Sequence, residues 1–265
     1  MVFFAGLPGT GKSRSLQRLA HLAHADGRTV HLLQWDVARP VFEASPAARR
    51  YPARDGVTHP LIRKAAGVWA RSAVTRWARR RPGSKHLLLG EAPLVGHRFL
   101  ELARREDDAA ERLLTLPSCR FVIPVPSVEV RRVIEAERQR RTGAQLHDRE
   151  REDALPHVLR SLWEDLVTAA RRLEMEASGE QASQVPYDPA LYERVYRHVL
   201  THRRVTVLAV ETVAPDAAVS VHAFGIPVHE VVPAPEEAWR FIHAVERTYH
   251  DADTLQEEVD RWYVV

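Results

Sequence analysis

The chain has 265 residues, of which 45% are hydrophobic and 28% charged, with a net charge of +3 and a pI near 9.2. This composition excludes a disordered or fibrous chain and predicts one α/β domain with additions or at most two small domains. No apolar run is long enough to span a membrane, and the mild positive charge permits an anionic partner without requiring one. The single cysteine, Cys119, cannot form an internal disulfide, so we expect a buried thiol and a cytoplasmic protein without a signal peptide.

The first predicted elements are a strand over residues 2–5 and a helix over 12–26, joined by a glycine-rich segment. That segment, Gly6-Leu7-Pro8-Gly9-Thr10-Gly11-Lys12-Ser13, has the spacing G-x-x-x-x-G-K-[ST] of a phosphate-binding P-loop. Its glycines let backbone N–H groups point at the phosphates, and the N-terminus of the following helix adds partial positive charge. We therefore expect Lys12 to reach the β- and γ-phosphates and the Ser13 hydroxyl to bind Mg²⁺.

A second strand is predicted over 29–35, ending at Asp36, and the strand–helix–strand order implies a parallel connection. Asp36 and Arg39 form the pattern D-x-x-R at the carboxyl end of this strand, where open parallel sheets bind their ligands. Asp36 there can act as a general base on a hydroxyl or hold a Mg²⁺-bound water, and Arg39 can bind a phosphate or carboxylate. The alternative is that Asp36 caps a helix and Arg39 is exposed to solvent.

The next stretch is predicted to be a loop followed by a helix. Residues 40–60 are rich in proline and glycine and carry several arginines, which fits either an acceptor-binding segment or a solvated basic loop. Residues 61–80 have apolar side chains at helical spacing. Their two tryptophans, Trp69 and Trp77, are expected in the core rather than as stacking platforms.

A third strand is predicted over 86–91, a buried run that ends in Glu91. An acid at the end of a strand downstream of a P-loop is a Walker B type of arrangement, with the carboxylate near Mg²⁺. The alternative is an incidental acid at a strand end. Residues 98–115 are then predicted to be a charged surface helix, with Gly96-His97-Arg98 at its start.

A fourth strand is predicted over 120–126, followed by a helix with Ser127 as its N-cap. This helix is rich in arginine and glutamate. Arginines just beyond a strand end can form a lid that closes over a nucleotide and stabilises charge on the transferring phosphoryl group. The alternative is a solvated helix face with Glu–Arg pairs four residues apart.

The remaining predicted elements are helices over 156–176 and 190–200, strands over 204–213, 219–224 and 228–232, and a final helix from Pro235. The fold class is α/β: a three-layer αβα sandwich of the P-loop NTPase type, with a mostly parallel sheet of five or more strands. We expect a single domain over 1–265, with a core over 1–125 and 156–213, a helical lid over 127–155 and a C-terminal extension over 214–265 that adds strands. The 14 histidines show no spacing typical of a metal site.

The P-loop, D-x-x-R after the second strand and an acid on the third resemble the P-loop kinases, in particular the polynucleotide kinase, gluconate kinase and zeta-toxin-like group. The resemblance covers about residues 1–170. It implies that Lys12 and Ser13 bind phosphate and Mg²⁺, that Asp36 is the base for the acceptor hydroxyl, and that Arg39 binds the acceptor. Arg138 and Arg141 are its candidate lid arginines. Glu91 stands where the group usually has Asp.

The sequence thus favours a kinase that uses ATP and Mg²⁺ to phosphorylate a hydroxyl of a small molecule. A second possibility is a polynucleotide kinase acting on a 5′-hydroxyl of RNA or DNA, whose binding would depend steeply on salt. A third is a nucleotide-binding switch or regulatory ATPase. The identity of the acceptor, the preference for ATP over GTP and the oligomeric state do not follow from the sequence.

Overall fold

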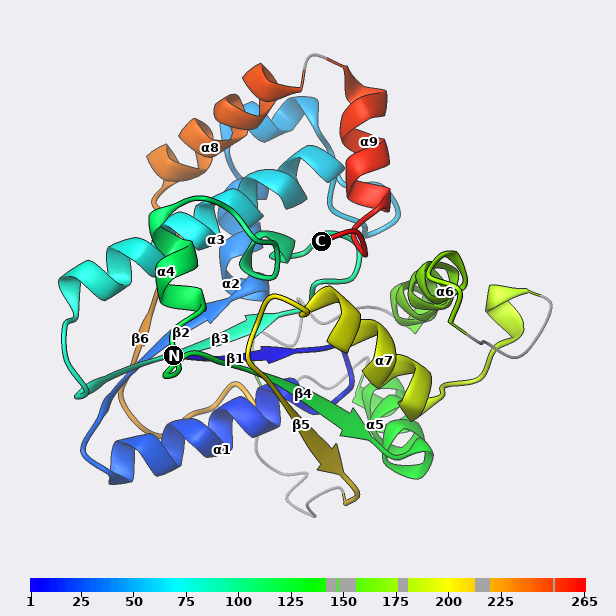
Figure 1. Ribbon diagram of the computed structural model, residues 1–265, viewed down its shortest axis with the longest axis horizontal. Helices are drawn as coiled ribbons and strands as arrows, with labels where there is room; N and C mark the ends of the chain where they lie inside the picture. Colours follow the sequence, from blue (N-terminus) through cyan, green and yellow to red (C-terminus); the bar gives the residue numbers. More distant parts are fainter. Residues whose placement is uncertain (142–146, 148–155, 176–180, 213–219, 250) are drawn as a thin grey trace.

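The computed structural model describes residues 1–141, 147, 156–175, 181–212, 220–249 and 251–265, with the backbone alone at 138–141 and 156. Six parallel strands form one sheet in the order β5-β4-β1-β3-β2-β6 (Figure 1). The strands are β1 (Val2–Ala5), β2 (Thr29–Gln34), β3 (His86–Ala92), β4 (Arg120–Pro126), β5 (Val205–Val210) and β6 (Val228–Glu230). The predicted α/β fold with a parallel sheet is confirmed.

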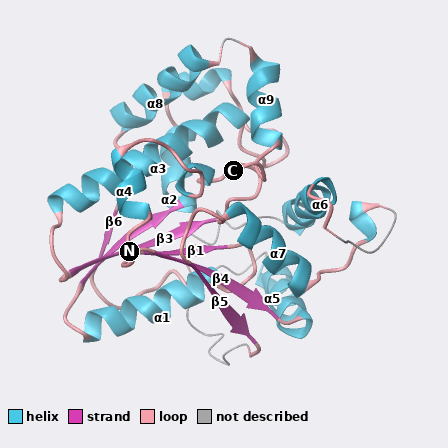
Figure 2. Ribbon diagram, viewed as in Figure 1, coloured by secondary structure: helices cyan, strands magenta, loops and turns pink. Residues whose placement is uncertain are grey.

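Helices lie on both faces of the sheet (Figure 2). They are α1 (Lys12–Ala25), α2 (Trp35–Glu43), α3 (Pro60–Arg80), α4 (Ala109–Leu114), α5 (Val128–Arg141), α6 (Pro156–Arg172), α7 (Pro189–Val199), α8 (Pro235–Thr248) and α9 (Ala252–Asp260). Single turns of 3₁₀-helix occur at Pro46–Arg50, Leu100–Leu102 and Ala182–Gln184.

Alternation along β1 separates the two hydrophobic layers, because successive side chains of a strand point to opposite faces. Phe4 packs with Leu16 of α1 in the smaller cluster. Phe3 belongs to the larger cluster, which includes the fully buried Trp69 of α3. Trp77 is only partly buried but packs on the same cluster, so both tryptophans are core residues as predicted. The sheet is therefore covered on both sides, as the predicted three layers require.

Two predicted elements are wrong. Residues 98–115 are not one helix: they form a 3₁₀ turn at Leu100–Leu102, a loop and the short α4. Ser220–Phe224 forms a turn and an extended stretch instead of a strand, whereas the strand predicted over 228–232 is present as β6, paired with β2. The helix that begins at Pro235 is α8, and α9 follows it.

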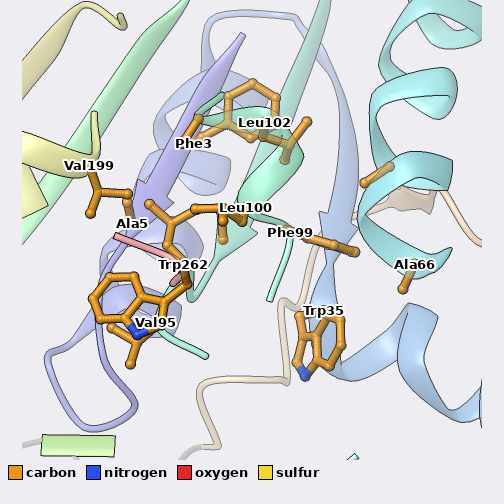
Figure 3. Close-up of a cluster of buried hydrophobic side chains, with 14 of the residues drawn as sticks. Phe3, Ala5, Trp35, Ala66, Val95, Phe99, Leu100, Leu102, Val199 and Trp262 are labelled. Atoms are coloured by element: carbon orange, nitrogen blue, oxygen red, sulfur yellow. The ribbon is translucent and has the colours of Figure 1, made fainter. Parts of the chain in front are cut away.

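The segment after β3 lies in the core and not on a charged surface. Every residue from 91 to 103 is buried. Its backbone adopts positive φ at Leu94 (64°), His97 (65°) and Phe99 (58°), a conformation that non-glycine residues rarely adopt. Figure 3 shows Val95 and Phe99 from this segment in the same buried cluster as Phe3 and Trp35. Burial of these apolar side chains holds the strained backbone in place.

Candidate functional site

The P-loop has the local structure that its sequence requires. It connects β1 to α1, and Gly9 (φ 78°) and Gly11 (φ 85°) adopt left-handed conformations that few other residues tolerate. Within the loop, the Thr10 hydroxyl donates a hydrogen bond to the Leu7 carbonyl (2.8 Å). The strand, the turn and the helix N-terminus of a phosphate-binding loop are all present.

Lys12, Ser13 and Glu91 form a cluster at the end of this loop. The Ser13 hydroxyl donates to Glu91 Oε1 (3.0 Å), and Lys12 Nζ lies 3.7 Å from the same oxygen. Lys12 Nζ also donates to the Leu7 carbonyl (2.8 Å). Glu91 lies on β3, whose register places it beside Phe4 of β1. Sheet pairing therefore brings this acid to the P-loop.

The same cluster includes Gln34, which the sequence did not single out. Gln34 is the last residue of β2 and pairs with Glu91 across the sheet. Its Nε2 donates to Glu91 Oε2 (3.1 Å), while its Oε1 is buried without a hydrogen-bond partner among the described residues. Because the ends of parallel strands meet at one edge of the sheet, the position of Gln34 next to Glu91 follows from the fold. The sequence could not identify it, because nothing distinguishes a glutamine at a strand end from glutamines elsewhere.

The donor set of this cluster fits Mg²⁺. This ion prefers oxygen ligands and keeps several waters, so one hydroxyl and one or two carboxylate oxygens suffice on the protein side. Ser13 Oγ and Glu91 Oε1 are within hydrogen-bond distance of each other, and the unpartnered Gln34 Oε1 can accept from a metal-bound water. Ser13 and Glu91 are thus together, as the predicted metal role requires, and that role stays a prediction.

An arginine of α5 contacts the P-loop, but it is neither of the two that were predicted. Arg131 donates from Nη1 to the Pro8 carbonyl (2.9 Å) and from Nε to Glu135 (2.6 Å), and its guanidinium lies over the Tyr187 ring (5.3 Å to the centroid). Arg131 occupies the first turn of α5, next to the strand end. That position is the signal that could have identified it. The side chains of Arg138 and Arg141 lie outside the described part of the chain, as do residues 142–146 and 148–155 of the predicted lid.

Helix α7 also packs against the P-loop. A Cβ atom on Gly6 would collide with the buried hydroxyl of Tyr192, so only glycine allows α7 to pack this closely. Tyr196, one turn further, donates to the carbonyl of Pro93 (2.6 Å) in the segment after β3. A single helix thus contacts both the phosphate loop and the loop that follows Glu91.

Asp36 and Arg39 lie on a helix and not at the end of a strand. Strand β2 stops at Gln34, which is the N-cap of α2, so Asp36 lies in the first helical turn and is not the cap. Asp36 is partly exposed, two residues beyond the Gln34 that contacts Glu91. Arg39 forms an ion pair with Glu43 (2.9 Å) one turn further. Asp36 therefore lies at the edge of the sheet that its predicted role requires, and that role stays a prediction.

Two other predictions concern cysteine and metals. Cys119 is fully buried, and burial raises the pKa of its thiol to about 11, as expected for an unreactive cysteine. Among the described residues, no group of three or more His, Cys, Asp or Glu side chains has the geometry to hold a metal ion. In that same part of the chain, every helix is too short or too polar to cross a membrane.

Comparison with known proteins adds little to this description. No family model matches the chain, and no curated protein sequence is similar to it. Among solved structures, Kti12 of Chaetomium thermophilum in complex with ADP-AlF3 aligns over 93% of this chain and 97% of its own, with 12% identity and a TM-score of 0.29. A likeness this low carries no argument about function.

Proposed function

We propose that this protein is a phosphotransferase that binds ATP with Mg²⁺ and moves the γ-phosphoryl group to a hydroxyl of a small-molecule acceptor. The observation that carries the proposal is the contact of Lys12 and Ser13 with Glu91 at the end of a complete P-loop. A cation, a hydroxyl and a carboxylate at this point are the groups that phosphoryl transfer from a nucleotide needs.

Each residue of the site has a proposed role. The loop amides and Lys12 hold the phosphates, and Lys12 neutralises charge that develops on the transferring group. Ser13 and Glu91 hold Mg²⁺, which supplies further charge neutralisation, and Gln34 orients Glu91. Arg131 fixes the loop through the Pro8 carbonyl. Asp36 accepts the proton of the acceptor hydroxyl.

Replacement of Asp36 tests the catalytic part of this proposal. In Asp36→Ala we expect transfer to fall roughly 10²- to 10⁴-fold, the usual contribution of a general base, with ADP affinity unchanged. Transfer is measured with γ-labelled ATP against a panel of hydroxyl compounds and 5′-hydroxyl oligonucleotides, and ADP affinity by calorimetry. Asp26→Ala is the matched control, because Asp26 is exposed at the far end of α1.

The outcomes separate the competing functions. Loss of ADP binding together with transfer would contradict the role given to Asp36. Label transferred only to oligonucleotides, with binding that weakens steeply as salt rises, would identify a polynucleotide kinase. ATP consumed with no labelled acceptor would identify an ATPase or switch.

A further inference from the structure

Two buried arginines meet at the loop that follows β3. Arg98 belongs to this loop and is 9% exposed, and Arg63 belongs to the N-terminal part of α3 and is 8% exposed. A Cβ atom on Gly96 would lie 2.8 Å from Arg98 Nη1 and 3.2 Å from Arg63 Nη1. Both guanidinium groups therefore lie beside the same glycine, with like charges close together.

These arginines use few of their hydrogen-bond donors. Arg63 Nη1 donates to the Gly96 carbonyl (2.6 Å) and Arg98 Nη1 to the Val95 carbonyl (3.0 Å), and among the described residues these are the only hydrogen bonds of the two side chains. Neither forms an ion pair within that part of the chain, and Arg63 Nε is buried without a partner. Buried charges are normally paired. Two buried guanidinium groups without an ion-pair partner therefore lack the anion that would normally accompany them.

Carboxylates near the two arginines do not neutralise them through ion pairs within the described part of the chain. Asp165 attracts both arginines, Asp36 also attracts Arg98, and Asp260 also attracts Arg63. None of these carboxylates comes within ion-pair distance of either guanidinium, and Arg39 repels Arg98. Burial lowers the pKa of Arg63 to about 10 and also lowers the pKa of Arg98. Both shifts mean that the charged forms are poorly stabilised by the protein alone.

This pair lies on the acceptor side of the proposed site. The loop that carries Arg98 begins directly after β3, and so just beyond Glu91. Phe99 of the loop packs edge-on against Trp35, in the first turn of α2, with ring centroids 5.4 Å apart. That contact brings the loop next to the turn that carries Asp36, and the attraction of Asp36 for Arg98 reflects the same proximity.

We propose that Arg63 and Arg98 bind a phosphate monoester group of the acceptor and thereby hold its free hydroxyl toward Asp36. A phosphate dianion matches two cations in charge, and its oxygens can accept from two planar guanidinium groups at once. The unused nitrogens supply the donors. The proposal rests on the proposed function, because it assigns a substrate class, phosphorylated hydroxyl compounds, to the same transfer site.

Calorimetric titration with inorganic phosphate tests this site while the P-loop is filled with saturating Mg²⁺–ADP, so that binding reports on the second site alone. Acetate at matched ionic strength serves as the comparison anion. We expect phosphate to bind the wild type more tightly than acetate. In Arg63→Gln and in Arg98→Gln, phosphate affinity should fall roughly 10- to 100-fold, the value of a lost hydrogen bond to a charged group. Arg76 lies on the same helix but is ion-paired with Glu237, so Arg76→Gln should bind phosphate as the wild type does.

Several results would overturn the proposal: no phosphate binding to the ADP-loaded wild type, a preference for acetate, or full affinity in both variants. If the glutamine variants do not fold by circular dichroism, Arg63→Lys and Arg98→Lys keep the charge but lose the planar fork, and unchanged affinity in these variants would also reject the site. Binding of Mg²⁺–ADP to the protein is measured in a separate calorimetric titration. A wild type that fails to bind ADP would contradict the proposed function, whereas phosphate binding without ADP would still report on Arg63 and Arg98 through their variants.

Discussion

Helix α3 buries two arginines in opposite electrostatic surroundings. Arg71 lies eight residues after Arg63, roughly 12 Å further along the helix axis. It donates to both carboxylate oxygens of Asp108 (2.6 and 2.9 Å), to Glu111 (2.6 Å) and to two backbone carbonyls. Arg203 pairs with the same Glu111 (2.8 Å). The side chain of Arg63, by contrast, makes a single hydrogen bond within the described part of the chain, to a carbonyl.

The difference separates a structural arginine from one that is available for binding. Where the donors of a buried guanidinium are used by the protein's own acceptors, as at Arg71, the group joins segments of the fold: here α3, α4 and the loop before α4. Its surroundings raise the pKa of Arg71 despite burial, through its bonds to Asp108 and Glu111. At Arg63 burial acts without that compensation, which leaves donors for an external anion.

The largest expected effect is on the paired arginine. Arg71→Met takes away the ion-pair partner of Asp108 and leaves Glu111 paired with Arg203 alone. Removing one member of a buried ion pair typically costs about 3–5 kcal/mol, and the partial exposure of both carboxylates places the cost here near the lower end of that range. We expect a loss of this order in the free energy of unfolding, measured by urea denaturation.

Arg76→Met is the control for this measurement. Arg76 lies on the same helix and pairs with Glu237, with both side chains partly exposed, and exposed ion pairs typically contribute about 0–1 kcal/mol. Equal losses in the two variants would show that the network around Arg71 does not stabilise the fold.

The parts of the site that depend on local sequence could be predicted. The P-loop needs only a strand, glycines at fixed spacing and a helix, and Glu91 follows from an acid within a buried strand. The start of α2 could not be predicted in the same way. Pro40 and the prolines after it favour a loop, but Trp35, Ala38 and Phe42 are buried on one face of α2. Their packing outweighs the loss of one helical hydrogen bond at Pro40.

The loop after β3 could not be predicted from local signals at all. Leu94, His97 and Phe99 adopt left-handed conformations without being glycine, and only long-range burial holds them there. The close approach of Arg63 and Arg98 depends on the conformation of this loop. Their proximity is a property of the tertiary structure, because the residues come from separate elements and neither belongs to a motif.

The second-largest expected effect is on how the free energy of unfolding changes with pH, through Glu111 and its pairs with Arg71 and Arg203. Hydrogen bonds from Arg203 and Arg71 outweigh burial and lower the pKa of Glu111 from 4.5 to about 2. Because the folded pKa lies below the unfolded one, Glu111 stabilises the fold above pH 4.5, and this contribution is lost as the pH falls toward 2. In Glu111→Gln the decline of stability with falling pH should be shallower, by at most about 1.4 kcal/mol per pH unit, the value for one proton, and by less because Glu111 is partly exposed.

Urea unfolding at several pH values between neutral and pH 2 measures this slope. Glu257→Gln is the control, since Glu257 is largely exposed in its pair with Arg261. Identical slopes in Glu111→Gln and the wild type would mean that the carboxylate of Glu111 is not specifically stabilised in the folded state.

The smallest expected effect is at the unpaired arginine. Arg63→Met removes one donor from the Gly96 carbonyl, which costs about 1–3 kcal/mol, but it also removes a buried cation that lies beside Arg98 without a counter-ion. Replacing a buried charge by an apolar side chain of similar length is often neutral or stabilising. We expect the two terms to offset each other to within about 1 kcal/mol in urea unfolding, far less than the loss in Arg71→Met. A loss as large as that of Arg71→Met would make Arg63 a second structural arginine, whereas a change within about 1 kcal/mol in phosphate-free buffer is what a binding residue requires.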